Sequence, residues 1–146
     1  MDFFSSMNVS ASALSAERTR MNLISSNLAN ANTTRTPEGG PYKRKDAVFS
    51  AAPLENSFGR ALDGATGQQI RQVQVSRIVE DQNPPRIQYD PSHPDADPQG
   101  YVAMPNVNVI EEMADMLTAS RAYEANVTAV QAAKNMALKT LEISSR

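Results

Sequence analysis

The residue types most able to do chemistry gather in the proline-rich segment 90–98. Asp90, His93, Asp95 and Asp97 lie there, and His93 is the only histidine of the chain. Carboxylates and an imidazole could bind zinc or calcium. The prolines between them favour a turn-rich, solvated connection instead, so we predict no metal site.

Other catalytic patterns are equally weak. A Ser-His-Asp arrangement would have to use His93, and no glycine-flanked nucleophile is present. The sequence has no phosphate-binding glycine loop, and the absence of cysteine removes disulfides, thiol nucleophiles and cysteine-type zinc sites. We therefore predict no catalytic residue, no cofactor and no enzymatic activity.

Charge argues against nucleic acid as a partner. The 146 residues carry 14 basic and 16 acidic side chains, for a net charge of -2, whereas phosphate binding needs concentrated positive charge. The only basic cluster is Lys43-Arg44-Lys45. Its members alternate faces on a strand, which favours a solvated edge and leaves an acidic partner as the alternative.

Neither a secretory signal nor a membrane-spanning segment is expected. The start, Met1-Asp2-Phe3-Phe4, has no basic region or sustained apolar stretch, and no segment approaches the roughly 20 apolar residues that cross a bilayer. On these facts alone, a cytoplasmic protein is the simplest expectation.

Two long helices are predicted at the ends of the chain. The first runs from Asp2 to about Ala31, and the second follows Pro105 and Asn106 and continues to about Ile143. Apolar residues recur at heptad intervals in both, which favours packing of helix on helix along a seam. In the first helix they are Met7, Leu14, Met21 and Leu28, with Phe4, Ala11 and Ile24 beside them; in the second they are Val109, Met116, Tyr123, Val130 and Ala137, flanked by Met113, Val127, Leu141, Ile110, Leu117 and Leu138.

The middle of the chain indicates short strands and loops. The predicted strands are 42–50, 70–80, 86–89 and 100–104, enough for one small sheet. A loop over 56–69 and the segment 90–98 connect them. The fold class is thus mainly α with a small β part: residues 1–34 form the first helix, 35–104 the β-rich middle, and 105–146 the second helix.

The apolar stripe of the second helix is wider than one partner helix can cover. The two helices can lie antiparallel, in a coiled-coil-like pair, yet each keeps an apolar flank. This leaves two alternatives open: a monomeric hairpin packed on its own sheet, or further helices supplied by other copies or other proteins.

Sequence motifs at both ends resemble those of a known protein family. Ser26-Asn27-Leu28-Ala29-Asn30, with residues 20–24 before it, is similar to the amino-terminal signature of bacterial flagellar rod, hook and hook-associated proteins. Residues 100–109, followed by Glu112-Met113 and 119–126, are similar to their carboxy-terminal region. The segments 40–45, 79–82, 89–91 and 138–141 narrow the resemblance to flagellar basal-body rod proteins of the FlgC type. It covers nearly the whole chain except the 56–69 loop.

The resemblance implies a structural subunit of the proximal rod, a tube that transmits torque and encloses the export channel. It implies export through the flagellar type III apparatus without a cleaved signal, and a location in the periplasm-spanning rod. The implied partners are other copies, proximal and distal rod proteins, rod–ring junction proteins and the export apparatus, without nucleic acid or direct membrane insertion. Both terminal helices would line the inner tube.

The predicted working residues are those of the helix seams and helix ends. Asn27 and Asn30 would use their amides to satisfy backbone groups where the first helix ends, and Arg121 would pair with a carboxylate of a neighbour; contacts within one chain are the alternative. The assembly residues are Met7, Leu14, Met21, Asn27, Leu28, Ala29, Asn30, Pro105, Asn106, Val109, Met113, Met116, Arg121, Tyr123, Asn126, Val130 and Leu141.

Two competing functions remain at this point. A type III secreted helical hairpin that acts on membranes would need a basic, continuously apolar helix face, and Glu111, Glu112, Asp115 and Glu124 argue against one. An enzyme acting on peptidoglycan is the other competitor.

Overall fold

The computed structural model describes residues 3–53 and 71–144. Within them the order of elements is α1 (Phe3–Ala29), β1 (Lys45–Pro53), β2 (Arg71–Glu80), β3 (Arg86–Tyr89), β4 (Tyr101–Met104) and α3 (Val109–Ser144). The predicted loop 56–69 lies outside the described residues. The fold is mainly helical with a small β part, as the sequence predicts.

Local polar groups define the end of α1 and the start of α3, which we call the inner ends of the two helices. At the end of α1 the backbone N–H and the side-chain Nδ2 of Asn30 both donate to the carbonyl of Ser26, at 3.1 and 2.9 Å. At the start of α3 the Asn108 side chain accepts from the backbone N–H of Ile110 at 3.2 Å, which is the bonding of an N-cap residue. The helix ends therefore fall close to the predicted positions.

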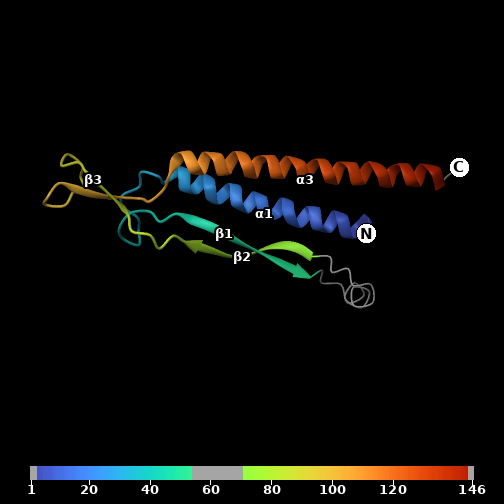
Figure 1. Ribbon diagram of the computed structural model, residues 1–146, viewed down its shortest axis with the longest axis horizontal. Coiled ribbons are helices and arrows are strands. Elements are labelled where there is room, and N and C mark those ends of the chain that lie inside the picture. The colour runs from blue at the N-terminus through green and yellow to red at the C-terminus, as the bar shows by residue number, and fades with distance from the viewer. Residues whose placement is uncertain (1–2, 54–70, 145–146) are drawn as a thin grey trace.

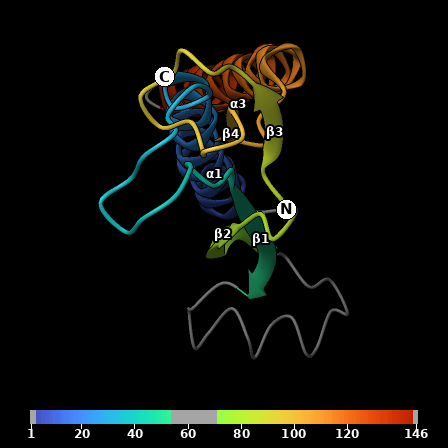
Figure 2. The same ribbon diagram turned by 90° about the vertical axis from the view of Figure 1, so that its left-hand side faces the viewer.

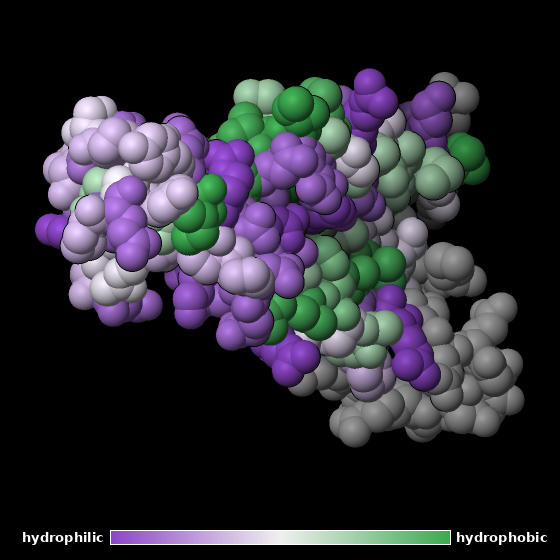
Figure 3. All heavy atoms as spheres, turned by 60° about the vertical axis from the view of Figure 1, so that its left-hand side comes forward, coloured by the Kyte–Doolittle hydropathy of each residue, from purple (hydrophilic) through white to green (hydrophobic). Residues whose placement is uncertain are grey.

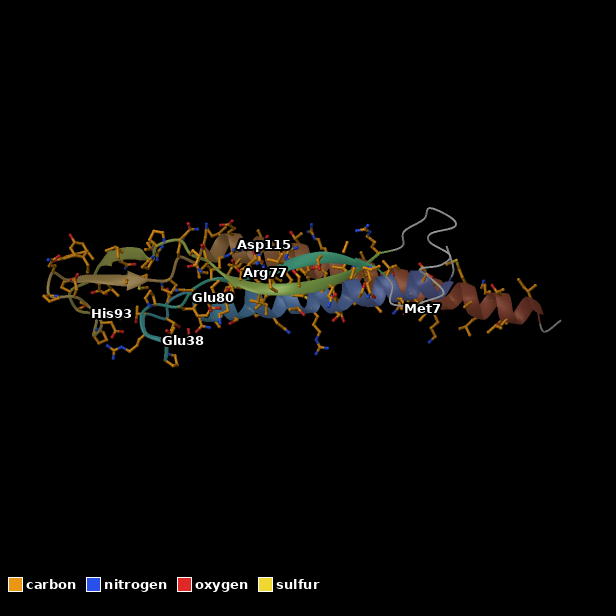
Figure 4. The ribbon with its side chains drawn as sticks, turned by 90° about the horizontal axis from the view of Figure 1, so that it is seen from below. Met7, Glu38, Arg77, Glu80, His93 and Asp115 are labelled. Atoms are coloured by element: carbon orange, nitrogen blue, oxygen red, sulfur yellow. The ribbon has the colours of Figure 1, made fainter. Side chains whose placement is uncertain are left out.

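The helices α1 and α3 lie side by side and antiparallel, with both termini of the chain at the same end (Figure 1). A side-chain contact between Asn27 and Glu112 sets their register. Phe3 lies 24 residues before Asn27, and 24 residues after Glu112 α3 has reached Met136. The last turns of α3 consequently extend past the start of α1, and Figure 4 shows α3 continuing beyond Met7.

The strands form two separate antiparallel hairpins instead of the single small sheet that we predicted. β1 pairs with β2, and β3 pairs with β4. The first hairpin lies along α1 on the side away from α3, so α1 is the middle layer (Figure 2). The backbone N–H of Val73 in β2 donates to Ser12 Oγ of α1 at 3.1 Å. The two hairpins lie in different places, the first alongside α1 and the second beyond the ends of the helices (Figure 1).

The first strand also begins later than predicted, at Lys45 instead of Tyr42. Tyr42 is held elsewhere: its backbone N–H donates to the carbonyl of Thr33 at 3.0 Å. Gly39 and Gly40, with φ of 91° and 78°, turn the chain between these two residues. Such positive φ values are accessible to glycine at low cost.

The second hairpin projects beyond the inner ends of the helices (Figure 1). Tyr89 and Tyr101 face each other across it with their rings edge to face and 5.3 Å between centroids. Gly100 has φ of 85°, and a Cβ there would come within 2.9 Å of the Tyr89 ring. A side chain at this position would therefore disturb both the turn and the aromatic pair.

Small residues dominate the core of this elongated protein. Hydrophobic spheres also lie on the surface along the upper edge in Figure 3, where α3 runs, beside the largely hydrophilic end that carries β3 and β4. The helix pair thus buries little apolar surface for its length. The buried hydrophobic residues among those described are Ala16, Ile24, Ala31, Val102, Val107, Ala119 and Ala133.

Candidate functional site

A cluster of polar groups around two buried side chains joins the end of α1, the start of β1 and the first turns of α3. We call it the polar junction; its members are Ser26, Asn27, Tyr42, Arg44, Lys45 and Glu112. Asn27 is only 1% exposed and lies at its centre. Its Nδ2 donates to the carbonyl of Lys45 at 2.9 Å and to Glu112 Oε2 at 3.0 Å.

The other side of the Asn27 amide is also fully used. Its Oδ1 accepts from the backbone N–H of Lys45 at 2.9 Å and from the hydroxyl of Tyr42 at 3.0 Å. Asn27 therefore pairs with both backbone groups of Lys45, as a neighbouring strand would. Our prediction that its amide satisfies the end of α1 is wrong, whereas Asn30 does bond to the carbonyl of Ser26 there.

An ion pair closes the junction toward α3. Glu112 is 1% exposed, and Arg44 Nε donates to its Oε1, while the Arg44 side chain is 26% exposed. Asp115 extends the pair, with one oxygen 3.8 Å from Arg44 Nη2 and the other 3.6 Å from Arg20 Nη2. Arg44 therefore does not lie on a solvated edge as predicted: its acidic contacts belong to the same chain, and an acidic partner molecule stays a prediction.

The groups around Arg44 favour the charged form of its guanidinium. Burial by itself lowers the pKa of Arg44, but the hydrogen bond to Glu112 and the charges of Glu112, Asp46 and Glu111 outweigh it, so the pKa lies above its ordinary value. A buried carboxylate needs such a partner, because removing the partner leaves an uncompensated charge in the interior. The junction therefore fixes how three segments sit on one another.

The segment 90–98 uses its polar groups in its own turns and in contacts with residues 34 and 35. Asp95 accepts from Thr34 Oγ1 at 2.8 Å and pairs with Arg35 at 2.7 Å, while His93 Nδ1 accepts from the backbone N–H of Asp95 at 3.1 Å. His93 lies at the end of the molecule opposite Met7 (Figure 4). Over residues 3–53 and 71–144, no three His, Asp or Glu side chains gather in a way that could hold a metal ion.

Neither helix of the described ranges combines the length and the apolar character that crossing a membrane would require.

The predicted seam residues of α1 lie beside the line of greatest burial. Met7, Leu14, Met21 and Leu28 are each half-buried, and Ala29 is exposed. The buried side chains of α1 are those of Ala16, Ile24 and Asn27. The line is shifted because α3 and the first hairpin contact α1 on different faces, which heptad spacing alone does not reveal.

On α3 the predicted residues divide into a half-buried and an exposed set. Met116, Tyr123, Asn126 and Val130 are half-buried, and Asn126 Nδ2 donates to the carbonyl of Ala122 at 2.9 Å. Before the helix, Pro105 is buried and Asn106 is exposed. The exposed helical residues are Val109, Met113, Arg121 and Leu141, and Arg121 makes no ion pair within the described parts of the chain.

Sequence reasoning missed the roles of Tyr42, Arg44 and Glu112 in the junction. Arg44 and Glu112 are 68 residues apart, and no local periodicity connects them. The only signal was their place within or beside motifs shared with the flagellar proteins. The buried alanines Ala16, Ala119 and Ala133 were missed as well, because a small residue gives no amphipathic signal.

Comparison with known proteins covers both ends and nearly the whole chain. Residues 7–35 match the family described as flagella basal body rod protein, and residues 99–143 match the flagellar basal body rod FlgEFG protein C-terminal family. The flagellar basal-body rod protein FlgC of Borreliella burgdorferi is 44% identical over 98% of both chains. The FlgC proteins of Bacillus subtilis and Salmonella typhimurium are 46% and 40% identical, over 98% and 93% of this chain and 99% and 93% of theirs.

Proposed function

The chain belongs to the FlgC-type flagellar basal-body rod proteins, and on that basis we propose that it forms part of the proximal rod, with α1 and α3 lining its inner tube. Membership of the family makes it a structural subunit of the flagellar rod. The finer proposal is that it transmits torque, encloses the export channel and crosses the periplasm. It reaches that place through the type III export apparatus without a cleaved signal.

The observation that carries this proposal is the unburied apolar surface of α3. Among the described helices and strands, α3 packs mainly on α1, and Ile110 is 79% exposed, Leu117 63% and Leu141 66%. A monomeric soluble protein rarely leaves so many large apolar side chains open in both the first and the last turns of one helix. Neighbouring rod subunits packed around the same tube would cover them.

The polar junction supplies the stiffness that torque requires. Residues 42–45 lead into the first hairpin, and Asn27 and Glu112 tie them to both α1 and α3, so a twisting load on this hairpin can pass through them to both helices. Several hydrogen bonds in a dry setting restrain orientation as well as distance. The proposed partners are further copies, other proximal and distal rod proteins, and the proteins at the rod–ring junction.

The experiment uses cells whose own copy is deleted and which express the chain with Tyr123→Ala or Gln131→Glu. Tyr123 is the largest side chain on the heptad line of α3 and is half-buried, so its truncation should prevent rod assembly, whereas Gln131 is exposed and its change should be nearly silent. Motility and rods in isolated basal bodies are scored, and circular dichroism of both purified variants controls for folding. Normal rods with Tyr123→Ala, or absence of the unaltered chain from basal bodies, would contradict the proposal.

A further inference from the structure

The seven methionines carry all the sulfur of this chain, because it has no cysteine. Two of them lie largely in solvent: Met113 is 54% exposed and Met136 is 64% exposed. The other described methionines are half-buried: Met7, Met21, Met104 and Met116. Peroxides oxidise sulfur, and a thioether has no proton to lose, so access from solvent decides which methionine reacts first.

Met113 and Met116 show this difference within three residues of α3. Met116 lies four residues after Glu112 and three before Ala119, and both of these are buried. Residues at these spacings share one face of a helix, so Met116 lies on the face that packs on α1. Met113 lies about 100° around the helix axis from Glu112, at the margin of that face. The same helix therefore offers an oxidant one open thioether and one that the fold partly covers.

Both exposed methionines lie among other exposed apolar side chains of α3. Met113 follows Ile110 by three residues and precedes Leu117 by four, so these three form one stripe. Met136 lies about two turns before Ile143, on the same side of the helix. Under the proposed function, neighbouring rod subunits cover this apolar surface. A polar atom placed within it would have to lose its hydrating water when a neighbour packs against it.

We propose that Met113 and Met136 are oxidation sites of the unassembled subunit, and that their sulfoxides block its incorporation into the rod while the fold stays intact. The oxidant is a peroxide such as hydrogen peroxide. The thioether sulfur takes one oxygen atom as the O–O bond breaks, the sulfur loses two electrons, and the second oxygen leaves as water. The product is polar where the thioether was apolar. The order of oxidation depends on the fold alone, whereas the block rests on the proposed function.

The order of oxidation is measured by treating the purified full chain with hydrogen peroxide and mapping the sulfoxides by peptide mass spectrometry. Met113 and Met136 should react roughly threefold faster, or more, than the four half-buried methionines. The matched control is the same reaction in denaturing urea, where all six should react at similar rates. Thermal unfolding of the chain oxidised at these two positions should be unchanged, because both side chains are mostly exposed. Equal rates at Met113 and Met116 in the folded chain, or a lowered unfolding temperature, would overturn the proposal.

Substitutions test the block without an oxidant, in cells whose own copy is deleted. Met113→Gln with Met136→Gln places an uncharged polar group of similar length at each site, as the sulfoxide does. Met113→Leu with Met136→Leu is the matched control, which keeps the apolar surface and cannot be oxidised. Basal bodies should contain about tenfold less of the glutamine variant, whereas the leucine variant should assemble normally. Both purified variants should unfold at the temperature of the unaltered chain. Normal rods with the glutamine variant, or equal loss with the leucine variant, would overturn the proposal.

Oxidation of isolated basal bodies separates the proposal from the proposed function. In rods that contain the chain, Met113 and Met136 should react about tenfold more slowly than in the free chain, because neighbours cover the apolar surface. Equal rates in rods and in the free chain would overturn the cover on which the block depends and leave a place in the rod standing. Preferential oxidation of the free chain, with basal bodies that lack even the unaltered chain, supports the oxidation sites and contradicts the proposed function.

Discussion

The two ends of the helix pair are built in opposite ways. At the polar junction, Asn27 and Glu112 are 1% exposed, and each bonds to a segment distant in sequence. In the last turns of α3, residues 136–143, the apolar side chains of Leu141 and Ile143 are exposed, because α1 does not extend that far within the described residues. Polar groups are buried where the chain folds on itself, and apolar groups are exposed where it ends.

This contrast distinguishes residues that determine the fold of the subunit from residues that gain contacts only on assembly. A buried polar network specifies one arrangement, because every alternative leaves charges or amides without partners. An exposed apolar helix end specifies no arrangement by itself and gains free energy when any suitable surface covers it. The junction thus sets the shape of the subunit. We expect the exposed last turns of α3 to contribute to stability only when another subunit covers them.

The largest effect on folding is expected from Arg44→Met. Without Arg44 the carboxylate of Glu112 stays buried with Asn27 as its remaining partner at the junction, and removal of one member of a buried ion pair costs about 3–5 kcal/mol. The free energy of unfolding, measured by urea denaturation, should fall by that amount. Adding Glu112→Gln should recover much of the loss, and Lys43→Met, at an exposed neighbouring position, should be nearly neutral. A loss under 1 kcal/mol for Arg44→Met would mean that the junction does not hold the fold.

A comparison of Asn27→Ala with Asn30→Ala should give the next largest difference. Asn27→Ala leaves Glu112, Tyr42 and both backbone groups of Lys45 short of a partner, and each buried polar group left unsatisfied costs about 1–3 kcal/mol. Asn30 is half-buried, and its Nδ2 donates to a carbonyl that also accepts from a backbone N–H, so Asn30→Ala should cost about 1 kcal/mol. Thermal and urea unfolding measure both. Equal losses would show that the sequence motif acts only as a helix end.

The middle of the pair can be tested with Ala119→Leu. Ala119 is fully buried where α3 contacts α1, and overpacking a close-packed site costs about 1–3 kcal/mol. Ala132→Leu, at an exposed position on the same helix, is the matched control and should change the stability by less than about 0.5 kcal/mol. If the two changes have the same effect on urea unfolding, α1 and α3 do not pack closely in solution.

The smallest effect is expected at Asp90, in the segment that follows β3. Hydrogen bonds from the Ser92 hydroxyl and backbone N–H lower the pKa of Asp90. A lowered pKa in the folded state adds stability above the unfolded pKa of about 4, and this is lost as the pH falls through the folded value. NMR titration of the Asp90 carboxyl should show the lowered pKa, and Ser92→Ala should move it upward. An ordinary pKa in the unaltered chain would contradict this turn.

Much of the local structure follows from sequence. The heptad spacing predicts α3 with a start after Pro105 and Asn106, and in the structure the side chain of Asn108 caps that start by accepting from the N–H two residues further on. The residues of β3, 86–89, fall where β-branched and aromatic side chains predict them. Those features depend on residues that are close in sequence, so they can be predicted without knowledge of the fold.

The candidate site was predicted only in part, because most of its contacts are distant in sequence. Asn27 was identified from its motif, yet its partners lie 15, 18 and 85 residues away. From sequence, Glu112 is an acidic residue that argues against membrane binding, whereas in the structure it is among the most buried side chains of the described residues. A heptad pattern assigned seam positions to Met7 and Leu14, whereas burial follows Ala16 and Ile24.

The sequence by itself determined the types of the elements and, through its terminal motifs, the family. Hydrophobic periodicity and cap residues act within a few residues, so they define helices and strands before any packing occurs. Tertiary structure alone decided the register of α1 against α3, and with it which side chains are covered. The Asn27–Glu112 contact places the start of α1 opposite Met136, so the apolar residues beyond it stay exposed. Burial is a property of distances in space, and here a polar contact between residues 85 positions apart sets them.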